Sequence, residues 1–259
     1  MNINLIRGKT GFSCDMDGVI YHGKKILPGV AEFINWLKAE NKKFLFLTNS
    51  SQSTPRELRE KLARLGLDVE ENHFYTSAMA CAAFLASQLP GGSVFVIGDP
   101  ALTNALYDAG FSMNDISPDY VVVGETYSYT YDRIVKAVLL VRKGARLIGA
   151  NPDLTGPTEA GIIPATGSLI APIELASGVK AYFTGKPNPL IMRNAIAKIG
   201  CRREDTVIIG DRMDTDIICG IEAGIDTVLV LTGVTAVEEL AKFAYRPGII
   251  FNNVGEIAG

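Results

Sequence analysis

Histidine and cysteine are scarce in this chain of 259 residues. It has two histidines, His22 and His73, and four cysteines that form no Cys-x-x-Cys pair. Two histidines so far apart in the sequence make a poor transition-metal site, and they support no Ser-His-Asp triad. Scattered cysteines are more typical of buried thiols in a reducing compartment than of disulfides or a zinc site. We therefore expect a cytoplasmic protein.

Long apolar runs and an excess of charge of one sign are also missing. No run approaches the roughly 18 residues of a membrane span. Residues 1–10 lack a long apolar core and a small-residue cleavage site, so we expect no signal peptide. Lys and Arg total 25 against 28 Asp and Glu. This balance offers no basic surface, so we expect neither nucleic acid nor a membrane as a partner.

What the chain does contain is an alternation of short apolar runs and helical patterns. Runs without polar alternation, typical of strands buried on both faces of a parallel sheet, cover residues 11–14, 44–47, 207–209 and 227–231. Helices are predicted over residues 31–40, 55–65, 189–199 and 215–223. This order predicts an α/β fold with a doubly wound parallel sheet.

A second alternating block occupies the middle of the chain. Its predicted strands are 94–97, 120–123 and 147–150, its predicted helices are 101–109 and 131–143, and residues 164–168 are predicted as a turn of small residues. We therefore expect a core formed by residues 1–77 plus 181–259, with an inserted α/β domain at 78–180.

Polar residues stop several of the predicted strands. They are Asp15, Asp17, Thr48, Asn49 and Asp211, and Lys186 follows the apolar pair at 182–183. In an open parallel sheet, ligands bind outside the carboxyl ends of the strands, so we expect these residues to converge. Carboxylates that meet at one edge repel each other and need a cation, either Lys186 or a metal ion. An all-oxygen set of ligands suits Mg²⁺.

Roles for the acids follow from this arrangement. Asp17 lies two residues after Asp15 and projects to the same side if the chain is still extended there. Two carboxylates with different neighbours can divide the chemistry, one attacking and the other carrying a proton. Asp211 can complete the metal site, and Asp216 can brace the loop behind it.

The remaining polar residues suit phosphate. Thr48 and Asn49 can offer a hydroxyl and amide donors to phosphate oxygens, and Lys186 is a compact positive charge that can hold both a nucleophile and a phosphate.

Together these residues resemble the four motifs of the haloacid dehalogenase (HAD) superfamily. The motifs are Asp15-Met16-Asp17-Gly18-Val19, Leu47-Thr48-Asn49, Gly185-Lys186-Pro187 and the segment 210–216. Only 31 positions separate Asp17 from Thr48, whereas 137 separate Asn49 from Lys186. The insert therefore resembles a type II cap. With the segments 74–77, 123–126 and 151–153, the chain is similar to the NagD-like, or 4-nitrophenylphosphatase-like, subgroup.

The resemblance implies a magnesium-dependent phosphomonoester hydrolase. Its substrates would be small phosphorylated metabolites: nucleoside monophosphates, sugar phosphates or 4-nitrophenyl phosphate. Asp15 would form an aspartyl-phosphate, and Asp17 would act as general acid and base. Asp15, the backbone carbonyl of Asp17 and Asp211 would hold Mg²⁺. Residues implied to bind phosphate or substrate are Thr48, Asn49, Lys186 and Arg212.

In the insert, Asn151 and Asp153 follow a predicted strand. They could face the substrate, or they could simply hold a turn inside the insert. Whether the chain forms a homodimer is left open.

Three other functions remain as alternatives. A dehalogenase needs no acid two residues after its nucleophile, so Asp17 argues against it. A phosphomutase is disfavoured by the type II cap position. A receiver-like phospho-Asp signalling module needs roughly half this length.

Overall fold

The computed structural model describes residues 2–158 and 161–259, which fold into two compact units. The first unit contains the chain up to Thr48, then Pro55–Tyr75 and Lys186–Gly259. The second contains Asn49–Thr54 and Thr76–Gly185. The domain predicted at residues 78–180 therefore falls inside the second unit, and a cap function for it is proposed below.

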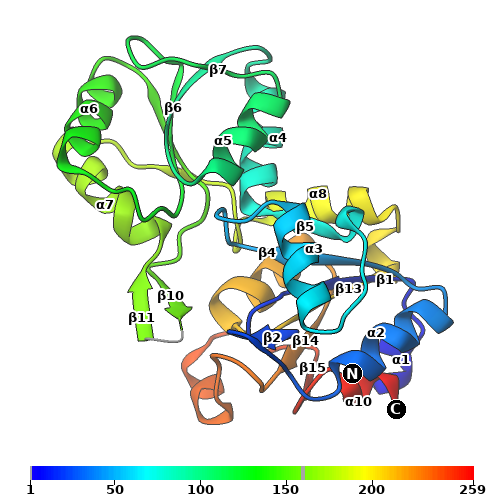
Figure 1. Ribbon diagram of the computed structural model, residues 1–259. Helices are drawn as coiled ribbons and strands as arrows, with labels where there is room; N and C mark the ends of the chain where they lie inside the picture. The colour runs from blue at the N-terminus through cyan, green and yellow to red at the C-terminus, as the bar shows by residue number, and fades with distance from the viewer. Residues whose placement is uncertain (1, 159–160) are drawn as a thin grey trace. The chain divides into compact units, whose positions relative to one another are not determined.

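A six-stranded sheet forms the centre of the first unit (Figure 1). In spatial order its strands are β15 (Ile249–Phe251), β14 (Asp226–Val230), β13 (Thr206–Gly210), β1 (Gly11–Cys14), β4 (Lys43–Thr48) and β5 (Phe74–Thr76). Strand β1 pairs in parallel with both β13 and β4. The chain order reverses at β1, which is where ligands bind in sheets of this type. The polar residues that follow β1, β4 and β13 thus emerge at one edge.

Helices and a small antiparallel hairpin complete the first unit. They are α1 (Ile3–Arg7), α2 (Val30–Ala39), α3 (Pro55–Arg64), α8 (Pro189–Ile199), α9 (Ile218–Ala223) and α10 (Gly255–Ala258), with β2 (Tyr21–His22) paired to β3 (Lys25–Ile26). Short 3₁₀ turns cover Glu71–His73, Arg203–Asp205 and Val237–Lys242.

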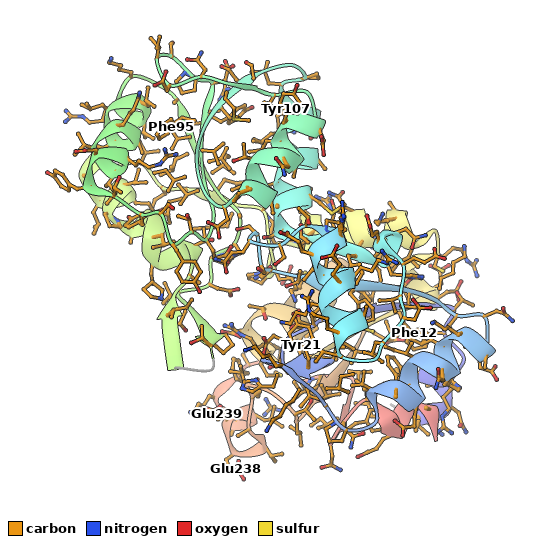
Figure 2. The ribbon with its side chains drawn as sticks, viewed as in Figure 1. Phe12, Tyr21, Phe95, Tyr107, Glu238 and Glu239 are labelled. Carbon is orange, nitrogen blue, oxygen red and sulfur yellow. The ribbon has the colours of Figure 1, made fainter. Side chains whose placement is uncertain are left out.

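Both faces of the central sheet are buried, as its uninterrupted apolar strands predict. Phe12 on β1 packs edge-on against Phe33 and Trp36 of α2 (Figure 2). On β4, Phe44 and Phe46 belong to the same core as Phe12. Leu45 lies between them in the strand, so its side chain points to the opposite face, where α8 contacts β1 and β4. Burial on both sides holds the strand ends in fixed positions.

The second unit has its own parallel sheet. In spatial order its strands are β12 (Tyr182–Phe183), β9 (Arg146–Gly149), β8 (Tyr120–Val123), β6 (Ser93–Ile97) and β7 (Ser112–Met113). Its helices are α4 (Ser77–Gln88), α5 (Pro100–Asp108), α6 (Tyr131–Arg142) and α7 (Thr166–Ser177), and a hairpin is formed by β10 (Thr155–Thr158) and β11 (Gly161–Pro164). Val96 faces the core formed with α4 and α5, whereas Phe95 faces α6 and α7 (Figure 2).

Two sequence-based predictions are wrong in detail. The helix predicted at 215–223 begins earlier, as a π-helical turn over Met213–Ile217 that leads into α9. The Ile217 N–H reaches back to the Arg212 carbonyl, which widens this turn. Residues 164–168 are not a turn, because α7 begins at Thr166. Gly167 donates its N–H to the Asp153 carbonyl. A side chain has no room at this position, because a Cβ on Gly167 would lie 2.4 Å from the Pro152 carbonyl oxygen.

All four cysteines are free thiols. Cys14, Cys81 and Cys219 are buried, and Cys201 is half-buried beside Thr10 at the start of β1. Burial raises the pKa of the Cys81 and Cys219 thiols to about 12, and it raises the pKa of Cys14 further. Across residues 2–158 and 161–259, none of the helices combines the length and hydropathy that crossing a bilayer requires.

Candidate active site

Three aspartates meet at the carboxyl edge of the first unit's sheet. Asp15 follows β1, Asp211 follows β13, and Asp216 lies in the π-helical turn. Each contributes a carboxylate oxygen to a group in which these atoms lie within 4.8 Å of one another. We call these three residues the acidic cluster. Its like charges require compensation.

Lys186 supplies part of that compensation. Its Nζ donates to Asp15 Oδ1 and to Asp216 Oδ1, both at 2.6 Å, and to the Leu47 carbonyl at 3.2 Å. The side chain is 2% exposed. Burial alone would lower the pKa of Lys186, but the two carboxylates raise it above its ordinary value. The ammonium therefore remains charged and joins the ends of β1 and β4 to the π-helical turn.

Asp211 is the member of the cluster that fits a metal ion. Its Oδ2 accepts the Val234 N–H at 2.7 Å. Its Oδ1 is buried and has no hydrogen-bond partner among the residues that the structure describes. Burial raises the pKa of Asp211 to about 8, and Asp15 and Asp216 push it in the same direction. A hard divalent cation beside this oxygen would satisfy the orphaned acceptor and the surplus negative charge.

The pKa of Asp15 is also raised, to about 7, mainly by burial. Lys186 opposes this shift and Asp216 adds to it. Any cation placed in the cluster would favour the ionised carboxylate, which is the form that can act as a nucleophile.

Glycines allow the backbone to approach the acidic cluster. A Cβ on Gly233 would lie 1.9 Å from Asp211 Oδ2, and a Cβ on Gly18 would lie 2.5 Å from the same oxygen. Gly18 also has φ +83°, a conformation that favours glycine. These two positions therefore accept no larger residue without moving Asp211.

The carboxylate of Asp17, which we expected to converge with those of Asp15 and Asp211, is not part of the acidic cluster. It is 42% exposed, and its Oδ1 lies 3.5 Å from Nδ1 of His22. Burial raises the pKa of Asp17, while His22 and then Lys61 oppose the shift. This contact leaves no pattern in the sequence, because His22 reaches Asp17 only when the chain turns back at Gly18, whose N–H donates to the Tyr21 carbonyl.

Two further predicted residues lie in the first unit. Thr48 ends β4, with only 9% of its surface exposed. The Arg212 guanidinium makes two hydrogen bonds to the Asp214 carboxylate, at 3.0 and 2.8 Å. Its backbone N–H donates to Asp216 Oδ2 at 3.2 Å, so Arg212 also helps to fix the acidic cluster.

The other three predicted residues come together in the second unit. Asn49 Nδ2 donates to Asp153 Oδ2 at 2.9 Å, and Asn151 Nδ2 donates to the Asn49 carbonyl at 2.7 Å. Asn151 Oδ1 in turn accepts the Asp153 N–H at 3.1 Å, as in an Asx turn. The same group contains Glu125 and Ser51, which we did not predict as site residues.

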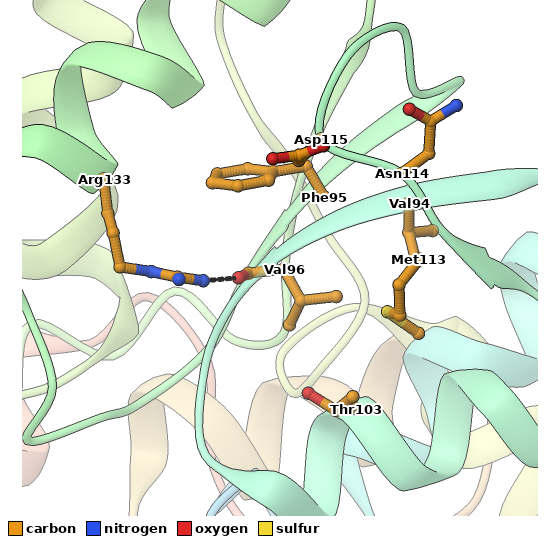
Figure 3. Close-up of a pocket in the computed structure, with 8 residues that line it drawn as sticks. All are labelled: Val94, Phe95, Val96, Thr103, Met113, Asn114, Asp115 and Arg133. Atoms are coloured by element: carbon orange, nitrogen blue, oxygen red, sulfur yellow. Dashed lines mark hydrogen bonds between the residues drawn. The ribbon is translucent and has the colours of Figure 1, made fainter.

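A hollow of about 300 Å³ also lies in the second unit, where the short strand β7 leaves part of β6 uncovered (Figure 3). The Arg133 guanidinium donates to the Val96 carbonyl there. The carboxylate of Asp115 is paired with Lys136. None of the predicted site residues lines this hollow.

Comparison with known proteins identifies the family. Residues 12–112 match the model of haloacid dehalogenase-like hydrolases, and residues 183–257 match that of HAD-hydrolase-like proteins. The chain is 45% identical to a dihydroxyacetone phosphatase of Corynebacterium glutamicum over 244 residues, which cover 94% of this chain and 89% of that one.

Two further relatives have solved structures. The chain is 43% identical to the ribonucleotide monophosphatase NagD of Escherichia coli, covering 94% of this chain and 96% of that one. The structure of NagD superposes with a TM-score of 0.91 over 96% of this chain and 98% of that one. A 4-nitrophenylphosphatase of Thermotoga maritima, 36% identical, gives 0.94 over 98% of both chains. The protein is therefore a haloacid dehalogenase-like hydrolase of the NagD-like subgroup.

Proposed function

We propose that this hydrolase cleaves small phosphomonoesters with the help of Mg²⁺ and through an aspartyl-phosphate on Asp15. The observation that carries the proposal is the arrangement around Asp15. Asp15 follows the buried strand β1, and one of its carboxylate oxygens accepts a hydrogen bond from Lys186. Asp211 lies beside Asp15, and its Oδ1 has no hydrogen-bond partner among the described residues. The named relatives are all phosphatases, each with its own named substrate.

The chain's own groups account for each step. Asp15 attacks phosphorus, while Lys186, Thr48 and Asn49 hold the phosphate oxygens. Asp17 gives a proton to the leaving oxygen and then takes one from the water that hydrolyses the acyl phosphate. The raised pKa of Asp17 favours its protonated form, which is the form that can act as an acid.

Asp15, Asp211 and the backbone carbonyl of Asp17 would hold Mg²⁺, with Asp216 bracing the cluster through Lys186. When bound, the ion would neutralise charge on the phosphate and on the carboxylates around it. An all-oxygen set of ligands without histidine or cysteine favours Mg²⁺ over zinc.

A screen of phosphomonoesters, read as released inorganic phosphate, tests the proposed function. It should include 4-nitrophenyl phosphate, dihydroxyacetone phosphate, a sugar phosphate and a ribonucleoside 5′-monophosphate, each with magnesium and with excess chelator. We expect inorganic phosphate to be released with magnesium and not with chelator. A sugar phosphate that is isomerised without release of phosphate would indicate a phosphomutase instead.

Magnesium should stabilise the protein more strongly at high pH than at low pH. Asp211 has its pKa raised to about 8, so between about pH 4 and pH 8 the folded, metal-free protein retains a proton that the unfolded chain releases. Stability without metal is therefore lost as the pH rises through this window. Because the ion needs the ionised carboxylate, the rise in Tm caused by magnesium should be larger near pH 8 than near pH 5.

Thermal melting with and without magnesium at the two pH values measures this difference. Asp211→Asn, which cannot ionise, serves as the control and should lose most of the magnesium effect at both pH values. An equal rise in Tm at both pH values in the wild-type protein would contradict the assignment of Asp211 as a ligand.

We also propose that the second unit acts as the cap and that Asp153 contributes to the choice of leaving group. Asp153→Asn should lower kcat/KM for substrates with hydroxyl groups by about 10-fold or more, the value of one lost hydrogen bond to a charged group. The rate with 4-nitrophenyl phosphate, which offers no hydroxyl, should change little. Steady-state kinetics with both kinds of substrate would measure this difference. An equal loss of kcat/KM on both would show that Asp153 has a purely structural role.

The free, buried thiols suit a cytoplasmic protein. The partner implied by the site is a small phosphorylated molecule. Light scattering would show whether the chain forms a homodimer.

A further inference from the structure

Glu125 is a half-buried carboxylate that the proposed chemistry does not use. It follows β8 in the second unit and receives three hydrogen bonds. The Ser51 N–H donates at 3.0 Å, the Ser51 hydroxyl donates as well, and Asn151 Nδ2 donates at 2.6 Å. Burial raises the pKa of Glu125, while Ser51 and Asn151 oppose the shift. A buried charge is costly unless it is fully hydrogen-bonded, so this residue is tightly fixed by its donors.

These donors connect Glu125 to the predicted substrate residues. Asn151 Nδ2 donates to both Glu125 and the Asn49 carbonyl. The same carbonyl accepts the Ser77 hydroxyl at 2.5 Å. With Asn49 Nδ2 bound to Asp153, the five residues Asn49, Ser51, Glu125, Asn151 and Asp153 form what we call the polar ring. Within it, the backbone and the side chain of Asn49 are both held in place.

The backbone around the polar ring is packed too closely to relax. A Cβ on Gly124 would lie 2.5 Å from the Ser51 hydroxyl oxygen. A Cβ on Gly185 would lie 2.7 Å from both the Asn49 side-chain oxygen and the Ala150 carbonyl. The segment around Asn49 and the segment before Lys186 are thus pressed together within the second unit. Close packing of this kind passes a change at Glu125 on to Asn49.

The chain passes from one unit to the other immediately beside the polar ring. Thr48 belongs to the first unit and Asn49 to the second, and the same is true of Lys186 and Gly185. Two residues to which we assign phosphate binding, Thr48 and Lys186, are therefore each one peptide bond away from residues that the polar ring holds or touches.

We propose that Glu125 is a positioning residue for the substrate. It acts through Ser51 and Asn151, which fix the Asn49 amide and the Asp153 carboxylate where they receive the leaving group and the phosphate. This inference rests on the proposed phosphatase function. A substrate with hydroxyl groups on its leaving group depends on both of those side chains, whereas 4-nitrophenyl phosphate depends on Asn49 through its phosphate but not on Asp153.

Glu125→Gln tests the proposal. The amide replaces one acceptor oxygen by a donor, which then faces the donors of Ser51 or Asn151. For the better of dihydroxyacetone phosphate and a ribonucleoside 5′-monophosphate, we expect kcat/KM to fall by about 10-fold or more, chiefly through KM. For 4-nitrophenyl phosphate, which depends on Asn49 but not on Asp153, we expect a smaller fall. The ratio of the two kcat/KM values is the readout, because a loss of folded protein would lower both alike.

Glu174→Gln is the matched control. Glu174 also lies in the second unit and accepts a backbone N–H, that of Ala181 at 2.8 Å, but it has no contact with the polar ring. It should leave the substrate ratio unchanged. Ser51→Ala removes one donor to Glu125 and should shift the ratio in the same direction, so it provides a second test if Glu125→Gln folds poorly.

The effects of Ser51→Ala and Glu125→Gln should also be less than additive in the double variant, because both act through one contact. The inference would be overturned if Glu125→Gln and Ser51→Ala gave the same ratio of the two kcat/KM values as Glu174→Gln. If the wild-type protein hydrolyses no phosphomonoester, the proposed function fails instead, so the two failures are distinguishable.

Discussion

Asp15→Asn is expected to abolish turnover of every phosphomonoester. The amide has nearly the same size as the carboxylate, but it cannot attack phosphorus, so no aspartyl-phosphate can form. Loss of a nucleophile costs at least about 10⁴-fold in kcat. Lys186 keeps its bond to Asp216 in this variant, so the fold around the site should survive. Initial rates of nitrophenol release from 4-nitrophenyl phosphate would measure the loss.

Asp17→Asn is the matched comparison, because it keeps the nucleophile and removes only the acid and base. Nitrophenol is a good leaving group and needs little help from an acid, so the first step should proceed. The second step lacks its base, and a phosphorylated Asp15 should accumulate and appear as a burst of nitrophenol. Turnover that survives in Asp15→Asn, or phosphate found covalently on Asp17, would refute these roles.

Lys186→Met is expected to destabilise the metal-free protein and to inactivate the enzyme. Methionine has a similar length but no charge, so the carboxylates of Asp15 and Asp216 lose the ammonium that lies 2.6 Å from each. Removing one partner of a buried ion pair typically costs about 3–5 kcal/mol. Urea unfolding of the chelator-treated protein gives the free energy of unfolding, and phosphate release gives the activity.

Lys198→Met controls for the loss of a lysine, because Lys198 lies exposed on α8 of the same unit. Its unfolding free energy should change by less than about 0.5 kcal/mol. Adding Asp216→Asn to Lys186→Met removes one of the stranded carboxylates and should restore part of the stability. A Lys186→Met protein as stable as the Lys198→Met protein would show that the ammonium does not hold the acidic cluster together.

The sequence predicted that Asp15 and Asp211 meet, because a parallel sheet brings its strand ends to one edge. It also placed Asp17 among them and Asp216 behind them, whereas the structure puts Asp216 in the acidic cluster and leaves the Asp17 carboxylate out. Asp15 and Asp211 follow neighbouring strands, and no other property of the fold is needed to place them together. Lys186 was predicted from its place after an apolar pair. It does lie against both Asp15 and Asp216.

Other parts of the site depend on tertiary structure that leaves no local pattern. Asn49 follows Thr48 directly, and yet the two residues fold with different units. Glu125 is hydrogen-bonded to Ser51, which lies 74 positions away in the sequence. The helix α4, rich in alanine and buried along much of its length, has no clear apolar stripe, so periodicity did not reveal it. A buried element or a long-range partner of this kind is specified by packing rather than by spacing.

The distribution of the thiols makes the natural chain suitable for labelling at one position. A thiol reacts as its thiolate, so the raised pKa values and burial of Cys14, Cys81 and Cys219 protect them from maleimide reagents. Cys201 is more accessible and lies beside Thr10, where β1 begins, whereas Asp15 follows the other end of that strand. A fluorophore could therefore be attached to Cys201, at the edge of the sheet opposite Asp15, without first replacing any other cysteine.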